Sequence, residues 1–187
     1  DIDEKIVKKN NSKNFLKLKK TLRIIYTGAI YLDEINPVIL LDAIVNLVNK
    51  KKIPKNSVIV EFYGARLDYI KDLSQKSKYS NLIKIKGHVP RPKVLEIQKK
   101  ADLLLLLASS KEISRGVLSG KIFEYMSAGR PILCIGGRPD FEISKVLKLT
   151  NTGLVFKNDE IKKLEDFIFK TFYDLEIFKN YKPKMNK

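Results

Sequence analysis

The sequence predicts an α/β protein built on a single doubly wound, mainly parallel sheet with helices on both faces. Short runs rich in Val, Ile and Leu alternate along the chain with amphipathic stretches of helical period. One run, DLLLLLAS, is apolar almost throughout, which is typical of a parallel strand covered on both faces. Right-handed crossovers between such strands place the intervening helices on the two faces of the sheet.

The first three predicted elements lie between residues 22 and 64. LRIIYTG at 22–28 is expected to form a strand, because β-branched and aromatic residues run up to a glycine. A helix is expected from Pro37 to Asn49, since the apolar residues of VILLDAIVNLV repeat with a helical period. SVIVEFYG at 57–64 has the composition of a second strand.

The middle of the chain continues this alternation. The amphipathic stretch from Leu67 to Lys76 is expected to be a helix, and NLIKIKG at 81–87 a short strand. A further helix is expected from Pro92 to Lys100, because proline is favoured in a first helical turn. DLLLLLAS at 102–109 then predicts a buried strand.

The last third of the predicted fold opens with a helix just after Ser119, which the turn residues GRP end sharply. The strand PILCIG at 131–136 follows directly. The remaining elements are expected to be a helix over 141–148, a short strand over 152–156 and a closing helix over 159–172.

The 187 residues fit one domain with a single core. We expect residues 21–174 to form it, after a polar linker or N-terminal extension over 1–20 and before a tail over 175–187. The single cysteine, Cys134, lies in an apolar run, which favours a small buried residue. No apolar stretch approaches the roughly 20 residues needed to cross a bilayer, so we expect a cytoplasmic protein or one lying peripherally at the inner face of the cell membrane.

The formal charge of +16 favours anionic partners: phosphorylated metabolites, acidic lipid head groups or nucleic acid. The lysines are spread along the whole chain, so a solvated surface without a dedicated site explains the charge equally well. The sequence lacks paired Cys or His spacings for zinc, a catalytic serine arrangement and a glycine-rich phosphate loop. We therefore expect no metal and no cofactor.

The segment SGKIFEYMSAGRPIL carries the strongest indication of a binding site. Ser119 suits an N-cap, with Gly120 and Lys121 in a first turn whose free N–H groups and positive dipole favour an anion. Lys121 and Glu124 share one face of the helix, opposite an expected core-facing side. A carboxylate can accept hydrogen bonds from both hydroxyls of a ribose, so the segment suits a mononucleotide. The ordinary alternative is a surface ion pair.

That core-facing side is expected to consist of Ile122, Phe123 and Met126.

In this segment the chain resembles the group 1 bacterial glycosyltransferases, enzymes of the GT-B architecture, particularly the branch that makes cell-surface polysaccharides. The resemblance covers most of residues 22–172. It also includes IIYTGAIY, FYGA, IKGHVPRPKVLEIQKKADLLLL, GGRPDFE and NTGLVF. In that family two Rossmann-like domains face each other across a cleft, and the carboxyl-terminal one binds the nucleotide sugar. The resemblance implies that this chain is that Rossmann-like half alone.

The resemblance also implies how the helix after Ser119 meets the donor. Glu124 would hold the ribose hydroxyls. Lys121, together with backbone amides near Ser119 and Gly120, would meet the diphosphate.

Further donor contacts are implied outside this helix. His88 and Val89 align with the turn that cradles the base. Gly28 would let the diphosphate or the facing domain approach the backbone, and Tyr26 beside it either lines the cleft or packs in the core. Glu142 lies where the family usually has an acid near the sugar.

Two features depart from the family pattern. An acid that commonly contacts the sugar is replaced by Gly116, and Arg and Lys after the first strand are replaced by Ala29 and Glu34. The candidates left to neutralise the phosphates are Lys121, Arg115 and Arg66.

The leading hypothesis is the donor-binding domain of a glycosyltransferase that moves a sugar from a nucleoside diphosphate sugar to a surface-glycan or lipid-linked acceptor. Its catalytic residues are unknown, because the main base is expected in the amino-terminal domain, and this chain alone is expected to transfer little. Peripheral contact with an anionic membrane is also expected, and nucleic acid is not expected as a partner. Two alternatives stay open: a basic nucleic-acid-binding module, and a nucleotide-sugar epimerase of similar architecture.

Overall fold

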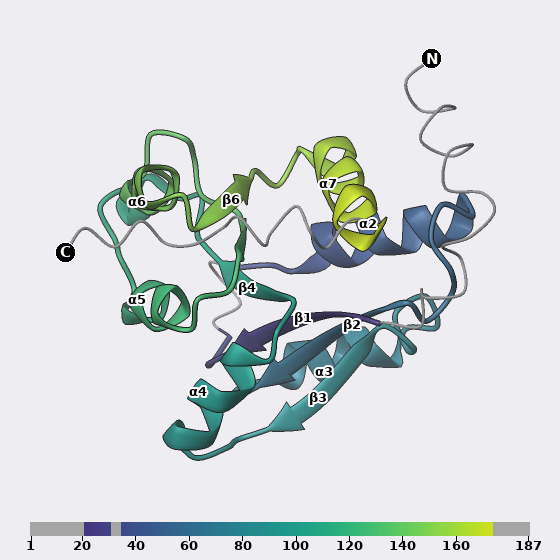
Figure 1. The fold of residues 1–187 in the computed structure, drawn as a ribbon. Helices are drawn as coiled ribbons and strands as arrows, with labels where there is room; N and C mark the ends of the chain where they lie inside the picture. Colours follow the sequence, from purple (N-terminus) through teal and green to yellow (C-terminus); the bar gives the residue numbers. More distant parts are fainter. Residues whose placement is uncertain (1–20, 31–34, 174–187) are drawn as a thin grey trace.

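The structure, a computed structural model, describes residues 21–30 and 35–173 of the chain. The predicted linker over 1–20, the tail over 175–187 and the departure at Glu34 lie outside the described residues. The described residues form one six-stranded sheet in the order β3-β2-β1-β4-β5-β6, and every strand pairing in it is parallel (Figure 1). Its strands are β1 (Leu22–Thr27), β2 (Val58–Tyr63), β3 (Ile83–Gly87), β4 (Leu103–Leu107), β5 (Ile132–Ile135) and β6 (Gly153–Phe156).

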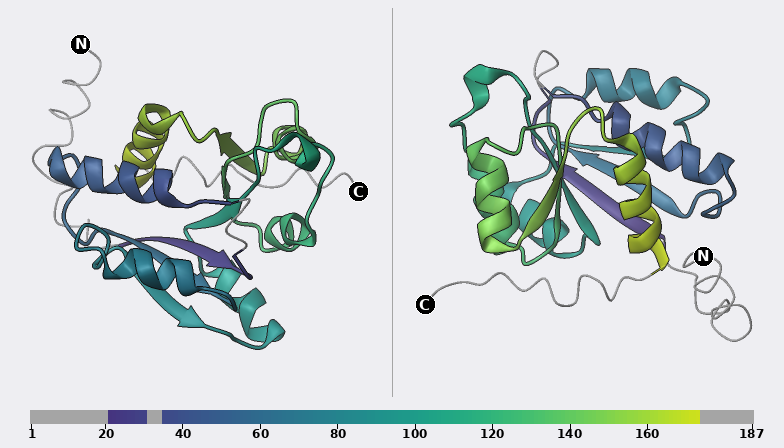
Figure 2. Two further views of the ribbon diagram at one scale, coloured as in Figure 1. Left: turned by 180° about the vertical axis from the view of Figure 1, so that it is seen from behind. Right: turned by 90° about the horizontal axis from the view of Figure 1, so that it is seen from above.

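Helices cover both faces of this sheet (Figure 2), which confirms the predicted doubly wound α/β class. They begin and end within about two residues of the predicted positions. The helices are α2 (Val38–Asn49), α3 (Asp68–Gln75), α4 (Arg91–Lys99), α5 (Gly120–Ser127), α6 (Glu142–Thr150) and α7 (Ile161–Tyr173), with a 3-10 turn, η2, at Glu112–Ser114.

The strand order reverses between β1 and β4. From β1 the chain moves outward through β2 to β3, then returns to β4 beside β1 and moves outward the other way. Ile24 of β1 pairs with Val60 on one side and with Leu103 on the other. Such a reversal opens a crevice at the carboxyl ends of the strands, where open α/β sheets bind ligands.

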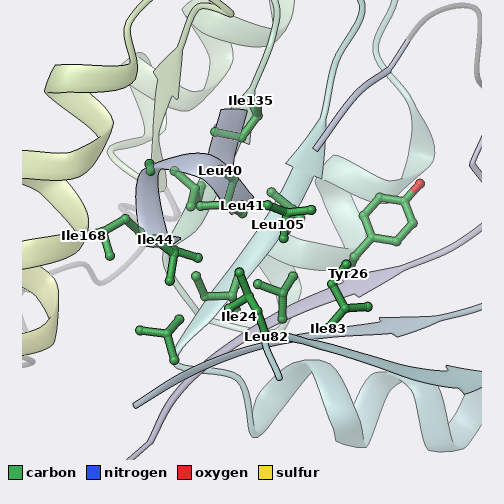
Figure 3. Close-up of a cluster of buried hydrophobic side chains, with 14 of the residues drawn as sticks. Ile24, Tyr26, Leu40, Leu41, Ile44, Leu82, Ile83, Leu105, Ile135 and Ile168 are labelled. Atoms are coloured by element: carbon green, nitrogen blue, oxygen red, sulfur yellow. The ribbon is translucent and has the colours of Figure 1, made fainter. Parts of the chain in front are cut away.

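Alternate residues of the central strands feed two cores. On one face, Ile24 and Tyr26 of β1 pack with residues of α2, α3 and α7, and Figure 3 shows part of this cluster. On the other face, Ile25 packs with Leu104 and with residues of α5 and α6. Because both faces of the central strands β1, β4 and β5 are buried, nearly every position of these strands is apolar, which explains their continuous runs in the sequence.

Helix α5 differs from the prediction on its buried side. Ile122 and Tyr125 are fully buried, Met126 is partly buried, and Phe123 is 54% exposed, so the expected core position of Phe123 is wrong. Residues three apart share a helical face, whereas Phe123 is turned about 100° away from Ile122. Tyr125 can be buried because its hydroxyl finds polar partners at the end of β1.

Cys134 lies in β5 as a free, fully buried residue, and burial raises the pKa of its thiol to about 12. The thiol is therefore protonated and unreactive at neutral pH, which agrees with the predicted role as a small buried residue. Over the described ranges, no helix has the length and apolar character needed to cross a membrane.

Candidate functional site

A cavity of about 360 Å³ lies at the carboxyl ends of β1 and β2, beside the reversal of strand order. Three loops, the start of α4 and one face of α5 meet there. Its lining residues are Thr27, Gly28, Ala29, Tyr63, Gly64, Ala65, His88, Val89, Arg91, Val94, Lys121 and Glu124.

Two glycines let the loops after β1 and β2 touch. Gly28 N donates a hydrogen bond to Tyr63 O at 2.7 Å, and Gly64 N donates to Gly87 O at 2.8 Å. A Cβ on Gly64 would lie 2.2 Å from the carbonyl oxygen of Gly28, and φ is +143° at Gly64 and +129° at Gly28. Only glycine adopts such angles readily, so this wall of the cavity is backbone.

Lys121 reaches from α5 across the end of β1. Its Nζ donates a hydrogen bond to the hydroxyl of Tyr26 at 2.9 Å and lies 4.0 Å from the centre of the Tyr26 ring. The same nitrogen lies 2.7 Å from the place where a Cβ on Gly28 would be. Gly28 therefore makes room for the amine at the cavity wall.

The surroundings of Lys121 lower the pKa of its amine. Burial lowers the pKa of Lys121 to about 8, and the negative charge of Glu124 opposes that shift. At pH 7 the amine still carries its charge, in a place where little water screens it. A partly desolvated cation of this kind attracts an anion more strongly than one in bulk water does.

Glu124 takes its partner from another helix. Its Oε1 accepts a hydrogen bond from Nη2 of Arg91, at the start of α4, over 3.1 Å. The side chain of Arg91 is 79% exposed and that of Glu124 35% exposed. The cavity thus presents Lys121 and Arg91 as cations, with a carboxylate between the two helices.

Buried polar groups fix α5 against the sheet. The hydroxyl of Tyr125 accepts a hydrogen bond from the backbone N–H of Thr27 at 3.0 Å. Nε2 of Gln98 on α4 donates to Oγ1 of Thr27 at 2.9 Å. Burial raises the pKa of Tyr125 to about 12, so the phenol stays neutral. These bonds set the position of the helix that carries Lys121 and Glu124.

Tyr63 supplies one aromatic wall of the cavity. Its hydroxyl donates to Oε2 of Glu61 at 2.7 Å, and Arg23 donates to both oxygens of that carboxylate at 3.1 and 3.0 Å. Burial first, and then the bond to Glu61, raise the pKa of Tyr63 to about 12. The ring is therefore held in one orientation by a bidentate ion pair behind it.

The structure brings together five of the nine predicted site residues in this cavity. They are Gly28, His88, Val89, Lys121 and Glu124. Ser119 is the N-cap of α5 as expected, although its side chain makes no capping hydrogen bond, and neither Ser119 nor Gly120 lines the cavity.

Arg115 and Glu142 lie outside this cavity and have other partners. Arg115 pairs with Glu112 and, at 2.9 Å, with Asp140, while Glu142 pairs with Lys145 at 2.7 Å. Backbone N–H of Glu142 also donates to the carbonyl of Arg115 at 3.0 Å. The Arg115–Asp140 pair and this backbone hydrogen bond join the loop before α5 to the segment at the start of α6.

Arg91 is a cavity residue that the sequence analysis did not single out. It lies 33 positions before Glu124, so no local spacing links the two. A basic residue directly before a proline at a helix start was the one available signal, and it is common at surfaces. The contact of Lys121 with Tyr26 spans 95 positions and has no signature in the sequence. Within the described ranges, no group of His, Cys, Asp and Glu side chains could hold a metal ion.

The family described as "Glycosyl transferases group 1" matches residues 7–181. A comparison with curated proteins finds no match.

Solved structures with the same fold include several glycosyltransferases. WaaG, involved in lipopolysaccharide biosynthesis, aligns with a TM-score of 0.64 and 16% identity over 95% of this chain and 44% of its own. A mutant of S. aureus TarM, in complex with fondaparinux, alpha-GlcNAc-glycerol and UDP, aligns with a TM-score of 0.60 and 16% identity. The alignment covers 87% of this chain and 31% of the TarM chain. The pneumococcal O-GlcNAc transferase GtfA, in complex with UDP and GlcNAc, aligns with a TM-score of 0.55 and 12% identity. The alignment covers 87% of this chain and 30% of the GtfA chain. The chain thus spans less than half the length of each.

Proposed function

Because the chain belongs to the group 1 glycosyl transferases, we propose that it is the half of such an enzyme that binds the nucleoside diphosphate sugar donor, with the nucleotide in the cavity at the ends of β1 and β2. One observation carries the proposal. A partly desolvated amine, Lys121, and a carboxylate, Glu124, meet in one cavity at the carboxyl edge of a parallel sheet. The amine can bind the phosphates of a nucleotide, and the carboxylate can accept hydrogen bonds from the ribose hydroxyls.

We assign the parts of the donor by chemistry. The diphosphate lies at Lys121, where Gly28 leaves the backbone open. The ribose hydroxyls donate to Glu124, and the base lies against His88 and Val89. The UDP in the TarM and GtfA structures supports a ligand of this class.

The chemical contribution of this half is charge stabilisation. As the bond between sugar and diphosphate breaks, negative charge grows on the departing phosphate, and Lys121 is placed to stabilise it. Of the described residues that line the cavity, Glu124 is the one acid. We propose that the base acting on the acceptor comes from the other domain and that this chain alone transfers little. The acceptor is proposed to be a surface glycan or a lipid-linked sugar, and contact with an anionic membrane stays a prediction from the charge.

A panel of ligands tests the proposal. UDP, GDP, ADP and CDP are each added while thermal unfolding of the chain is followed. At 100 times its dissociation constant, a true ligand adds about 2.7 kcal/mol of stability. We expect one diphosphate to stabilise the chain clearly more than its nucleoside monophosphate does.

The same unfolding measurement with oligonucleotides, and an assay with a nucleotide sugar, separate the alternatives. Stabilisation by oligonucleotides that falls steeply with salt, with no response to any diphosphate, would favour a nucleic-acid-binding module instead. Conversion of a nucleotide sugar without an acceptor would favour an epimerase.

Affinity for the diphosphate is expected to fall as the pH rises above about 8. The charged amine of Lys121 binds the anion, and its pKa of about 8 means that the charge is lost in that range. The bound anion raises this pKa, so affinity is full below 8 and then drops by up to about tenfold per pH unit. Calorimetric titrations between pH 7.5 and 8.5 measure this, because in that range the phosphates are ionised and the bases of all four diphosphates keep their N–H protons.

The stability of the ligand-free chain should move in the opposite direction. The pKa of Lys121 is lowered in the folded state, so the unfolded chain binds more protons between about 8 and 10.5. The contribution of Lys121 to stability therefore improves as the pH rises through that window. A diphosphate affinity that stays constant from pH 7.5 to 8.5 would contradict the assigned role of Lys121.

A further inference from the structure

Lys121 and Glu124 lie one turn apart on α5, yet each takes its partner from another element. Lys121 donates to Tyr26 of β1 and Glu124 accepts from Arg91 of α4. Among the ion pairs of the described residues, the two do not pair with each other. At the same spacing Glu112 pairs with Arg115, Glu142 with Lys145 and Glu160 with Lys163. Asp68 with Lys71 on α3 and Lys93 with Glu96 on α4 form no such pair among the described residues.

Part of this difference follows from the order of the residues. In the three formed pairs the acid precedes the base, which is the favourable order along a helix, whereas in α5 the base comes first. The reverse order weakens a pair without preventing it. Spacing therefore does not settle the pairing, and both α5 side chains have tertiary partners: Tyr26 for Lys121 and Arg91 for Glu124.

We propose that Arg91 is a positioning residue that holds the Glu124 carboxylate away from Lys121, so that the cavity offers its cation and its carboxylate to a ligand separately. Arg91 engages one carboxylate oxygen, Oε1, so Glu124 is held in place while Oε2 can still accept a hydrogen bond. The use of this separation for a nucleoside diphosphate rests on the function proposed above. A Lys121 neutralised by Glu124 would attract a diphosphate poorly, and a Glu124 bound to Lys121 would serve a ribose poorly.

Among the described residues, few titratable groups lie near Lys121, which makes the effect measurable. They are the hydroxyl and ring of Tyr26 and the cavity residues Glu124, Arg91, His88 and Tyr63. Because Arg91 is largely exposed, its ion pair adds little to stability, and the variant Arg91→Met is expected to fold.

A double-mutant cycle in the ligand-free chain tests the proposal. The pKa of Lys121 is read from its Cε resonance in protein with ¹³C-labelled lysine, assigned with Lys121→Arg. Arg91→Met is expected to raise that pKa by about one pH unit, because the released Glu124 turns toward Lys121. In the Glu124→Gln background the same substitution should change it far less.

The cycle separates two causes of such a rise. Removing Arg91 also removes a positive charge near Lys121, and that effect persists without Glu124. An equal rise in both backgrounds, or no rise at all, would overturn the proposal. Arg130→Met serves as the control, since Arg130 is exposed, donates to Lys99 O and follows the other end of α5.

Binding gives a second readout, with UDP, GDP, ADP and CDP as probes. For whichever of them the unaltered chain binds, Arg91→Met is expected to lower the affinity about tenfold and Arg91→Lys to lower it less. A lower affinity with an unchanged Lys121 pKa would mean that Arg91 acts on the ligand directly, which overturns the positioning role. If the unaltered chain binds none of the four, the proposed function fails, while the pKa cycle still decides the role of Arg91.

Discussion

Replacing Lys121 by methionine is expected to weaken nucleoside diphosphate binding by between about tenfold and about 150-fold. Hydrogen bonds to charged groups contribute about 1.5 to 3 kcal/mol, and the other cation among the described cavity residues, Arg91, lies on α4 and is engaged by Glu124. Methionine keeps an unbranched apolar stem over Gly28, so the change removes the charge and little of the packing. Isothermal titration calorimetry with the best ligand of the panel measures the loss.

The stability of the variant should not fall with its affinity. Burial already disfavours the charged amine, as its lowered pKa shows, so the ligand-free protein loses little when the charge is removed. Lys163→Met is a matched control, because Lys163 is an exposed residue on α7 paired with Glu160 three positions earlier. Equal affinity losses in the two variants, or a Lys121 variant that is strongly unfolded, would argue against a specific contact with the phosphates.

The fold was predictable because each element carries a local pattern. The five leucines of β4 and the repeating apolar residues of α2 show how both faces are covered, and parallel pairing with right-handed crossovers then restricts the topology. Local sequence patterns determine the orientation of a single side chain less well. Phe123 and Tyr125 are both aromatic and both lie on α5, and the buried one is the residue whose hydroxyl meets Thr27.

The site was predictable where its residues are close in sequence. Lys121 and Glu124 come from one helical turn at the sheet edge, so spacing and strand direction place them together. Arg91 and Tyr26 come from other elements, and their contacts depend on how α4, α5 and β1 pack. Glu142, which the family resemblance implies near the sugar, stays a prediction, and in the structure it lies outside the cavity and pairs with Lys145.

The largest loss of stability is expected from Gly64→Ala. Its Cβ would lie 2.2 Å from the carbonyl oxygen of Gly28, which is backbone and cannot turn aside, and its φ of +143° is strained for any residue with a side chain. We expect the free energy of unfolding to fall by about 3 kcal/mol or more, as for severe steric substitutions. Urea unfolding followed by circular dichroism measures it. Since the loops after β1 and β2 must move apart, nucleoside diphosphate binding should also be lost.

Gly87→Ala is the matched control for this substitution. Gly87 also has a positive φ, +68°, but no atom lies within 4 Å of its would-be Cβ. The free energy of unfolding of Gly87→Ala should therefore fall only by the cost of the left-handed backbone, about 1 to 2 kcal/mol. The difference between the two variants reports the contact between Gly64 and Gly28 together with the greater backbone strain at φ +143°. Equal losses would mean that the two loops are not pressed together as described, and the wall of the cavity would then be open to side chains.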